Sequence, residues 1–360
     1  MQKDRTNRVF LLQYRVSVAL WLLIGLIGLE CFIRTFVYSP TARVIYKPDL
    51  GTLPVTGSTV VRGTEGFGVT HYSDDGEVLT SFSAPSGPRI VLLGDSHTEA
   101  LQVNDAEKYP SIAAAALQQD GMTANFHNIA QSGSSMADFV YLAPFVHAQF
   151  HPRIVVIQIG VQSFVDGNAF DTQHTNYFVM ASDGSLQLKH KALPDRTADW
   201  MLSPKRDFAL IDYGISRWNE MMNKIKSQQT RLAAEPATPT VNATPTEAND
   251  FPRKVKAQLD ALHNAYPDVT LVIVFLPFVP YIQHNTLVTQ DRDEDLVRLS
   301  LLPRTYWRVV DPTADFNALV QLGKLPRGFA NTTPGSGHLN ADGHAVVGKL
   351  LAQQLEDLLR

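Results

Sequence analysis

The sequence predicts an α/β fold, a three-layer, doubly wound and mostly parallel sheet, and three observations support it. Residues Ile90 to Leu93 form an unbroken apolar run, as expected of a strand buried on both faces of a parallel sheet. Similar runs recur at 153–160 (RIVVIQIG) and 270–276 (TLVIVFL). Helical patterns separate these runs, and strands that alternate with helices imply right-handed crossovers and a parallel sheet.

The remaining elements follow the same alternation. We expect further strands at 126–130 and 308–311, and helices at 109–119, 136 to about 150, 254–265 and 341–359. A block from about 165 to 250 interrupts the alternation and is interpreted as an insertion at the carboxyl edge of the sheet. Within it we expect a hairpin over 177–191, a helix over 213–231 and a flexible Pro/Thr/Ala-rich stretch over 235–249.

The N-terminus carries a targeting signal. Residues 16–33 form an apolar run of eighteen residues with one charge, Glu30. A helix of this length is about the shortest that can cross a bilayer. Four basic residues precede this run, so the positive-inside rule keeps 1–15 in the cytoplasm, makes 16–38 a single-pass anchor and exports the rest. A cleaved signal peptide and a buried soluble helix are the alternatives, although no A-x-A-like cleavage site closely follows the run.

Residues 39–87 are rich in Gly, Pro, Thr and Val, and they predict a small β-rich lead-in, with a solvated stalk as the alternative. The main domain then spans 88–360. A net charge of −4 without a basic stripe argues against nucleic acid as a partner. The single Cys31 excludes an internal disulfide and a Cys-based zinc site, and no pattern indicates a cofactor or metal.

Four short polar stretches follow predicted strands or precede the last helix, so all four should meet at the carboxyl edge of the sheet. Acyl transfer needs a nucleophile, a base and donors for an oxyanion. Ser96 supplies a hydroxyl, with a simple helix cap as its alternative role, and His338 supplies an imidazole. The N–H groups of Ser96 and Gly133 and the amide of Gln162 are the candidate donors. The stretches are Gly94-Asp95-Ser96, Gln131-Ser132-Gly133, Gly160-Val161-Gln162 and Gly337-His338-Leu339-Asn340.

These stretches resemble the four blocks of the SGNH (GDSL-type) hydrolases, which carry a Ser, a Gly, an Asn and a His. GDSHTEA matches the first block well, Gly133 in NIAQSGSSMADF matches the second loosely, and the H-x-N-x-x-G-H framing after His338 fits the last. Two departures stand out. Gln162 replaces the Asn, and Gly335 and Ser336 occupy the positions of the Asp that orients the histidine. The carbonyl near Gly335, the Ser336 hydroxyl and Asp311 are the candidate substitutes, whereas Asp342 is expected to face away.

The resemblance covers about 88–165 and 270–360 and implies a flavodoxin-like fold and an acyl-enzyme on Ser96. It implies an esterase or O-acyltransferase, facing the periplasm from a bacterial inner membrane and acting on an acylated glycan, with other polysaccharide-modification proteins as further partners. The alternatives are a lysophospholipase or thioesterase, and a catalytically degenerate protein that binds glycan or scaffolds an export complex.

Overall fold

The computed structural model describes residues 2–39, 44–47, 51–54, 56–166, 176–181, 185–191, 208–233, 250–278, 281–283, 286–288, 292–301, 306–332 and 334–360. The chain divides into two compact units. One holds residues 1–43 and 198–237, and the other holds 44–197 and 238–360.

The larger unit is built on a five-stranded sheet whose neighbouring strands are all parallel, in the order β13-β10-β7-β5-β6. This is the flavodoxin-like order, in which the direction of winding reverses between the first and third strands of the chain. The predicted doubly wound α/β fold is therefore confirmed. The strands are β5 (Arg89–Leu93), β6 (Asn125–Asn128), β7 (Ile154–Ile159), β10 (Thr270–Phe275) and β13 (Trp307–Val310).

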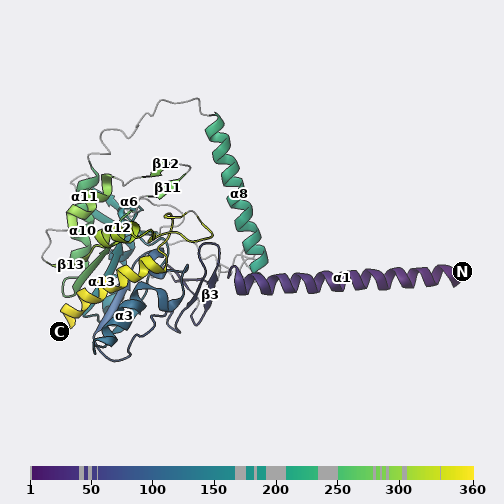
Figure 1. Ribbon diagram of the computed structural model, residues 1–360, viewed down its shortest axis with the longest axis horizontal. Coiled ribbons are helices and arrows are strands. Elements are labelled where there is room, and N and C mark those ends of the chain that lie inside the picture. Colours follow the sequence, from purple (N-terminus) through teal and green to yellow (C-terminus); the bar gives the residue numbers. More distant parts are fainter. Residues whose placement is uncertain are drawn as a thin grey trace. The chain divides into compact units, whose positions relative to one another are not determined.

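Helices cover both faces of the sheet and give the larger unit three layers (Figure 1). Because successive side chains of a strand point to opposite faces, Ile90 and Leu92 pack on one helical layer while Val91 and Leu93 pack on the other. The first layer consists of α3 (Tyr109–Gln119), α12 (Thr313–Gln321) and α13 (Ala341–Leu359). The second consists of α4 (Met136–Tyr141), α5 (Ala143–Phe150), α6 (Val161–Asp166), α10 (Phe251–Ala265) and α11 (Arg292–Leu301).

The single helix expected over 136 to about 150 is wrong. Two helices, α4 and α5, meet at Leu142, which ends the first and precedes the second. Pro144 has no N–H to donate to the preceding turn, so it fits the first turn of a new helix and not the interior of a long one.

The lead-in contains two antiparallel pairs of short strands, β1 (Val44–Lys47) with β2 (Gly51–Pro54), and β3 (Thr59–Arg62) with β4 (Gly68–His71). It is not a solvated stalk, because Thr70, Tyr72 and Val78 are buried. The N–H of Val78 donates to the carbonyl of Asn128 at 2.8 Å, which ties the lead-in to the edge strand of the sheet.

The smaller unit consists of α1 (Gln2–Phe36) and α8 (Ala209–Ala233). Among the described residues, one helix is long and apolar enough to cross a membrane, over Phe10–Phe36. That segment contains the predicted apolar run. The helix α8 likewise contains the predicted 213–231.

The hairpin expected over 177–191 forms from β8 (Asn176–Met180) and β9 (Leu186–His190), although its turn at 182–184 lies outside the described residues, as does 235–249. The remaining short elements are α2 (Ser96–Glu99), the 3-10 turn η1 (Asp105–Glu107), β11 (Tyr281–Gln283) and β12 (Thr286–Val288).

Candidate active site

Ser96 is the first residue of α2, with two residues between it and the end of β5, which lies between β7 and the edge strand β6. The cap of this helix is Asp95, whose carboxylate accepts the N–H of His97 at 2.8 Å. Gly94 makes the tight turn possible, because a Cβ there would collide with the Thr98 hydroxyl. The capping role that Ser96 could have held is thus taken by its neighbour, which leaves the Ser96 hydroxyl available to another partner.

That partner is His338. Its Nε2 lies 2.8 Å from the Ser96 Oγ, although the two residues are 242 positions apart in the chain. His338 belongs to the loop that precedes α13, so the sheet edge brings together the two residues expected there. The distance is that of a hydrogen bond between a hydroxyl and an acceptor nitrogen.

The second ring nitrogen of His338 faces Glu65, a residue of the lead-in that was not among the expected site residues. The Nδ1 lies 2.6 Å from one Glu65 carboxylate oxygen, and the backbone N–H of His338 donates to the other at 2.8 Å. The Glu65 carboxylate therefore contacts both the ring and the backbone N–H of the histidine. It occupies the place that the missing Asp would have filled, and it comes from the lead-in.

The close approach of Gly337 and three hydrogen bonds of Asn331 hold Glu65 in this place. Gly337 has φ +85, and a Cβ there would collide with the Glu65 carboxylate, so only glycine allows the approach. Asn331 donates to the carbonyls of Gly63 and Gly66 at 3.0 and 3.1 Å and accepts the N–H of Gly66 at 2.8 Å. The loop between β3 and β4 is consequently held against the loop that carries His338.

The charge state of Glu65 follows from these contacts. Partial burial by itself would raise the pKa of the Glu65 carboxyl, but the hydrogen bonds from the ring and backbone of His338 outweigh it and hold the pKa below 4.5. Glu65 is ionised at neutral pH, and a carboxylate at Nδ1 favours the tautomer in which Nδ1 carries the proton. In that tautomer Nε2 can accept the Ser96 proton.

The loop after β6 carries Gly133, whose φ is +83. It is tied to α2 by Glu99, which accepts the N–H of Ser132 at 2.9 Å and also bonds the Ser132 hydroxyl. The other oxygen of the buried Glu99 accepts the hydroxyl of Tyr72 at 2.6 Å. In the described part of the chain, neither the N–H of Ser96 nor that of Gly133 donates to a protein acceptor.

Gln162 lies in the first turn of α6, directly after β7, and its side chain is exposed. Gln162 therefore follows the carboxyl end of β7, the strand next to β5, as expected from its position in the sequence. A second glutamine, Gln158, is buried within β7. Its Oε1 accepts the N–H of Asp95 at 3.0 Å and the hydroxyl of Thr98 at 3.1 Å, which fixes the turn that presents Ser96.

A partly buried polar cluster contacts the same turn. Arg327 donates to the carbonyls of Gly337 and Pro277 at 3.1 and 2.9 Å, and its Nη1 lies 3.2 Å from the Nε2 of His97. Burial and the nearby guanidinium hold the pKa of His97 well below its usual value, so this imidazole stays neutral and accepts the hydrogen bond. Burial also raises the pKa of Asp95, against the opposing charge of Arg327.

The two other acids considered from the sequence, Asp311 and Asp342, have different partners. The Asp311 carboxylate accepts the N–H of Thr313 at 3.0 Å at the start of α12. Asp342 pairs with Lys324 at 3.1 Å on the surface. The signal that could have found Glu65 is an acid flanked by glycines in GTEGFGV, a pattern that equally fits an ordinary turn.

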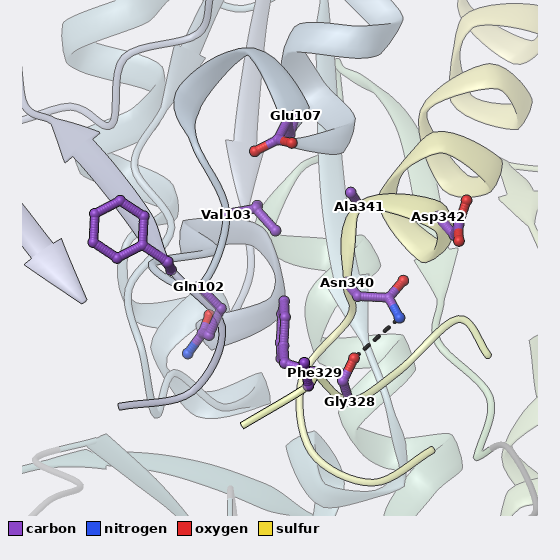
Figure 2. A pocket seen from close by; sticks show the side chains of 10 residues that line it. Gln102, Val103, Glu107, Gly328, Phe329, Asn340, Ala341 and Asp342 are labelled. Carbon is purple, nitrogen blue, oxygen red and sulfur yellow. Dashed lines mark hydrogen bonds between the residues drawn. The ribbon is translucent and has the colours of Figure 1, made fainter. Parts of the chain in front are cut away.

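A pocket of about 380 Å³ adjoins the segments that carry the three residues (Figure 2). Phe67 follows Glu65 by two positions, Asn340 follows His338 by two, and Gln102 lies beyond the end of α2. The lining combines two phenyl rings with two carboxylates, from Phe67, Phe329, Glu107 and Asp342. Among the residues that the structure describes, no group of three or more His, Cys, Asp or Glu side chains is arranged to hold a metal ion.

No protein-family model and no curated protein matches the sequence. Solved structures do match. An acetylxylan esterase variant from Geobacillus stearothermophilus is 16% identical with a TM-score of 0.40, and the match covers 76% of this chain and 96% of that one. A psychrotrophic esterase from Pseudoalteromonas is 10% identical with a TM-score of 0.38, over 76% and 99% of the two chains. A member of the lipolytic G-D-S-L family from Veillonella parvula is 14% identical with a TM-score of 0.38, over 74% and 97%. Likeness of this size carries no argument about activity, which has to rest on the geometry of Ser96, His338 and Glu65.

Proposed function

We propose that this protein is a membrane-anchored serine esterase or O-acyltransferase of the SGNH type, acting on an acylated glycan outside the cytoplasm. The observation that carries the proposal is the line of contacts from Ser96 Oγ through His338 to Glu65, at 2.8 and 2.6 Å. A nucleophile, a base and an acid in hydrogen-bonded sequence are the parts that acyl transfer through a serine requires.

The reaction begins when Ser96 Oγ attacks the ester carbonyl carbon and its proton passes to His338 Nε2. Glu65 stabilises the resulting imidazolium through Nδ1–H. The oxyanion of the tetrahedral intermediate accepts hydrogen bonds from the N–H groups of Ser96 and Gly133, with the amide of Gln162 as a third donor. Collapse of the intermediate breaks the ester bond, and the leaving alkoxide takes the proton from His338. Water or a sugar hydroxyl then attacks the acyl-enzyme, with His338 again as the base.

The pocket supports a glycan as the substrate class. Phenyl rings can stack on the apolar faces of sugar rings, while carboxylates and amides accept and donate hydrogen bonds to hydroxyls. Its walls belong to the segments that carry the three proposed catalytic residues. A hydroxyl-rich ligand seated there would contact Phe67 and Asn340, each two positions along the chain from a proposed catalytic residue.

The helix α1 supports an anchor over a cleaved leader. Glu30 near its end accepts the N–H groups of Ala209 and Leu210 at 2.8 Å each, and Ile33 and Tyr38 are buried against Ala209. Removal of α1 would strip α8 of its cap. With basic residues before the span, the N-terminus stays in the cytoplasm and the larger unit faces the periplasm of a bacterial inner membrane.

The test compares the full-length protein in detergent with Ser96→Ala, His338→Ala and, as a matched control, Ser300→Ala in α11. We expect hydrolysis of p-nitrophenyl acetate and labelling by a fluorophosphonate probe in the wild type and the control, and loss of both in Ser96→Ala. Equal activity in all four proteins would refute the proposal. Labelling of Ser96 also argues against a degenerate, non-catalytic scaffold, because an unactivated serine reacts poorly.

Two further measurements separate the related activities. Acylated oligosaccharide with and without an added sugar acceptor distinguishes hydrolysis from transfer, read as acylated product by mass spectrometry. A series of p-nitrophenyl esters of increasing chain length distinguishes acetyl esters from the long acyl chains of a lysophospholipase or thioesterase. We expect the highest kcat/KM for the acetyl ester.

A further inference from the structure

The outer end of α1 is joined to α8 by a charged residue in an otherwise apolar segment. Both carboxylate oxygens of Glu30 accept backbone N–H groups of the first turn of α8, and Arg34 donates to Glu30 at 2.5 Å. The rings of Tyr38 and Tyr213 pack beside this junction at 6.0 Å. The N-terminus of α8 is therefore fixed at the level where the apolar segment of α1 ends.

From its first turn onward, α8 presents an exposed apolar stripe. Ile211, Trp218 and Ile225 follow one another at intervals of seven residues, and their side chains are 39%, 60% and 38% exposed. Phe208 and Met221 flank them and are 51% and 45% exposed. At 3.6 residues per turn these positions share one side of the helix, and none belongs to the residues packed on α1.

We propose that α8 is an interfacial helix, which lies on the outer surface of the membrane with this stripe in the boundary between headgroups and acyl chains. The inference rests on the anchor in the proposed function. Its partner is a lipid surface.

Three observations favour lipid over a second protein. The stripe begins at the junction with the span, so the first turn of α8 is already at membrane level. Its largest member is a tryptophan, the side chain enriched at membrane interfaces, and the helix carries four basic residues against two acidic ones. Among the side chains that the structure describes, the contacts of α8 with α1 lie near Glu30, in the first turns of α8 (Figure 1). The rest of α8 is thus free to follow the surface, over about 30 Å of helix at 1.5 Å per residue.

The chain's own tryptophans provide the test. The full-length protein is placed in phosphatidylcholine/phosphatidylglycerol vesicles that contain a nitroxide quencher either shallow or deep in the acyl chain. The emission of each tryptophan is obtained by subtracting the spectrum of its Phe variant from that of the wild type. Trp218→Phe reports on α8, Trp21→Phe reports on the span, and Trp307→Phe reports on a residue buried in the sheet unit.

We expect the Trp218 component to be shifted to shorter wavelength and to lose most of its intensity to the shallow quencher, with less loss to the deep one. The Trp307 component should respond to neither. Emission of Trp218 at the wavelength of free tryptophan, or a short wavelength that neither lipid quencher affects, overturns the proposal. The first outcome means water on the stripe, and the second means a protein partner or a second copy.

The Trp21 component separates the two ideas. If Trp21 is quenched and Trp218 is not, the anchor stands and the interfacial helix fails. If neither is quenched, α1 does not enter the bilayer and the anchor itself is refuted. Ser216→Trp in a Trp218→Phe background is the matched control, since position 216 lies about 160° around the helix from Trp218 at 3.6 residues per turn and its emission should resist lipid quenching.

Discussion

Glu65 reaches His338 from a loop 273 positions earlier in the chain. A carboxylate from a distant part of the sequence can orient the histidine as well as one placed just before it. The orientation of the ring depends on the atom that faces Nδ1 and not on the order of the residues. The longer side chain of glutamate also leaves one oxygen for Nδ1 and one for the backbone N–H of His338.

Replacing Glu65 tests this role. In Glu65→Gln the amide would favour neither the Nδ1–H tautomer nor the imidazolium, so we expect kcat/KM on p-nitrophenyl acetate to fall by about 10³–10⁴-fold. Glu65→Asp should recover part of the loss, since it restores the charge but not the reach. Glu356→Gln, in the last helix, is the matched control. A Glu65→Gln enzyme with wild-type kcat/KM would show that the acid has no part in catalysis.

The same contact predicts a pH effect on stability. Because the pKa of Glu65 in the folded protein lies below 4.5, the folded state holds the ionised form more strongly than the unfolded chain does. The contribution is complete above the unfolded pKa and is lost as the pH falls through the folded value. The difference in urea midpoint between wild type and Glu65→Gln should therefore shrink from pH 6 towards pH 3. A difference that stays constant over this range would contradict the assignment.

Sequence reasoning found Ser96 and His338 because their spacing from strands is local information. It did not find Glu65, since a hairpin glutamate between glycines has no local feature that distinguishes it from a solvated turn. The contact exists only because Asn331 and Gly337, far along the chain, shape a loop to receive it. The contact between Glu65 and His338 therefore depends on how the lead-in packs against distant loops, which no single segment of the sequence specifies.

Among elements, the loop after β6 depends on α2. Glu99 holds Ser132, and Ser132 precedes the Gly133 whose N–H is a proposed oxyanion donor. In Glu99→Gln an amide N–H would face one of the donors that the carboxylate now satisfies. We expect kcat to fall by up to about 10²-fold with little change in KM, because the donor acts mainly in the transition state. Glu77→Gln, which disturbs only a contact with His127, serves as control. A rise in KM with unchanged kcat would instead assign Glu99 to substrate binding.

The pairing of α13 with α3 carries a second pH effect. The Nδ1 of the buried His344 accepts the N–H of Tyr109 at 3.3 Å, and burial, with the charge of Lys108, lowers the pKa of His344 to about 3. Below the unfolded pKa near 6.5, His344 is protonated in the unfolded chain but stays neutral in the folded state. The free energy of unfolding therefore falls as the pH drops. The expected loss is roughly 3 kcal/mol between neutral pH and about pH 4.

This effect is measured as the free energy of unfolding in urea at several pH values, for wild type and His344→Asn. The Asn Oδ1 can take the place of Nδ1 as acceptor but does not titrate, so the variant should lack this part of the slope. Identical slopes in the two proteins would show that His344 is protonated in the folded state.

The sequence located most regular elements because apolar periodicity is a local record of burial. The bounds of α3 and α13 agree with those expected. The break between α4 and α5 was missed, although Pro144 was visible, because the apolar pattern continues across it. Patterns of burial report which face is covered and do not report where one helix stops and another begins.

At the scale of the whole molecule, the helix α1 combines two features. It is apolar enough to span a bilayer, and its last turns are built into the unit that contains α8. Cleavage after Phe36 would leave the first N–H groups of α8 without the Glu30 carboxylate and would expose Ala209, which is buried. These contacts favour the retained anchor of the proposed function over a cleaved leader.

We predict that the mature protein keeps α1. Intact-mass analysis of protein extracted from membranes should give the mass of the full chain, with at most the initiator methionine removed, and an N-terminal tag should remain in the membrane after alkaline carbonate washing. Glu30→Ala should keep the anchor, since the span becomes more apolar, yet loosen α8 and speed its digestion by trypsin at Arg217 in detergent. Asn219→Ala, an exposed position on the same helix, is the matched control. A mature N-terminus beyond Phe36 would show that α1 is a leader, and unchanged digestion of Glu30→Ala would show that the carboxylate does not hold α8.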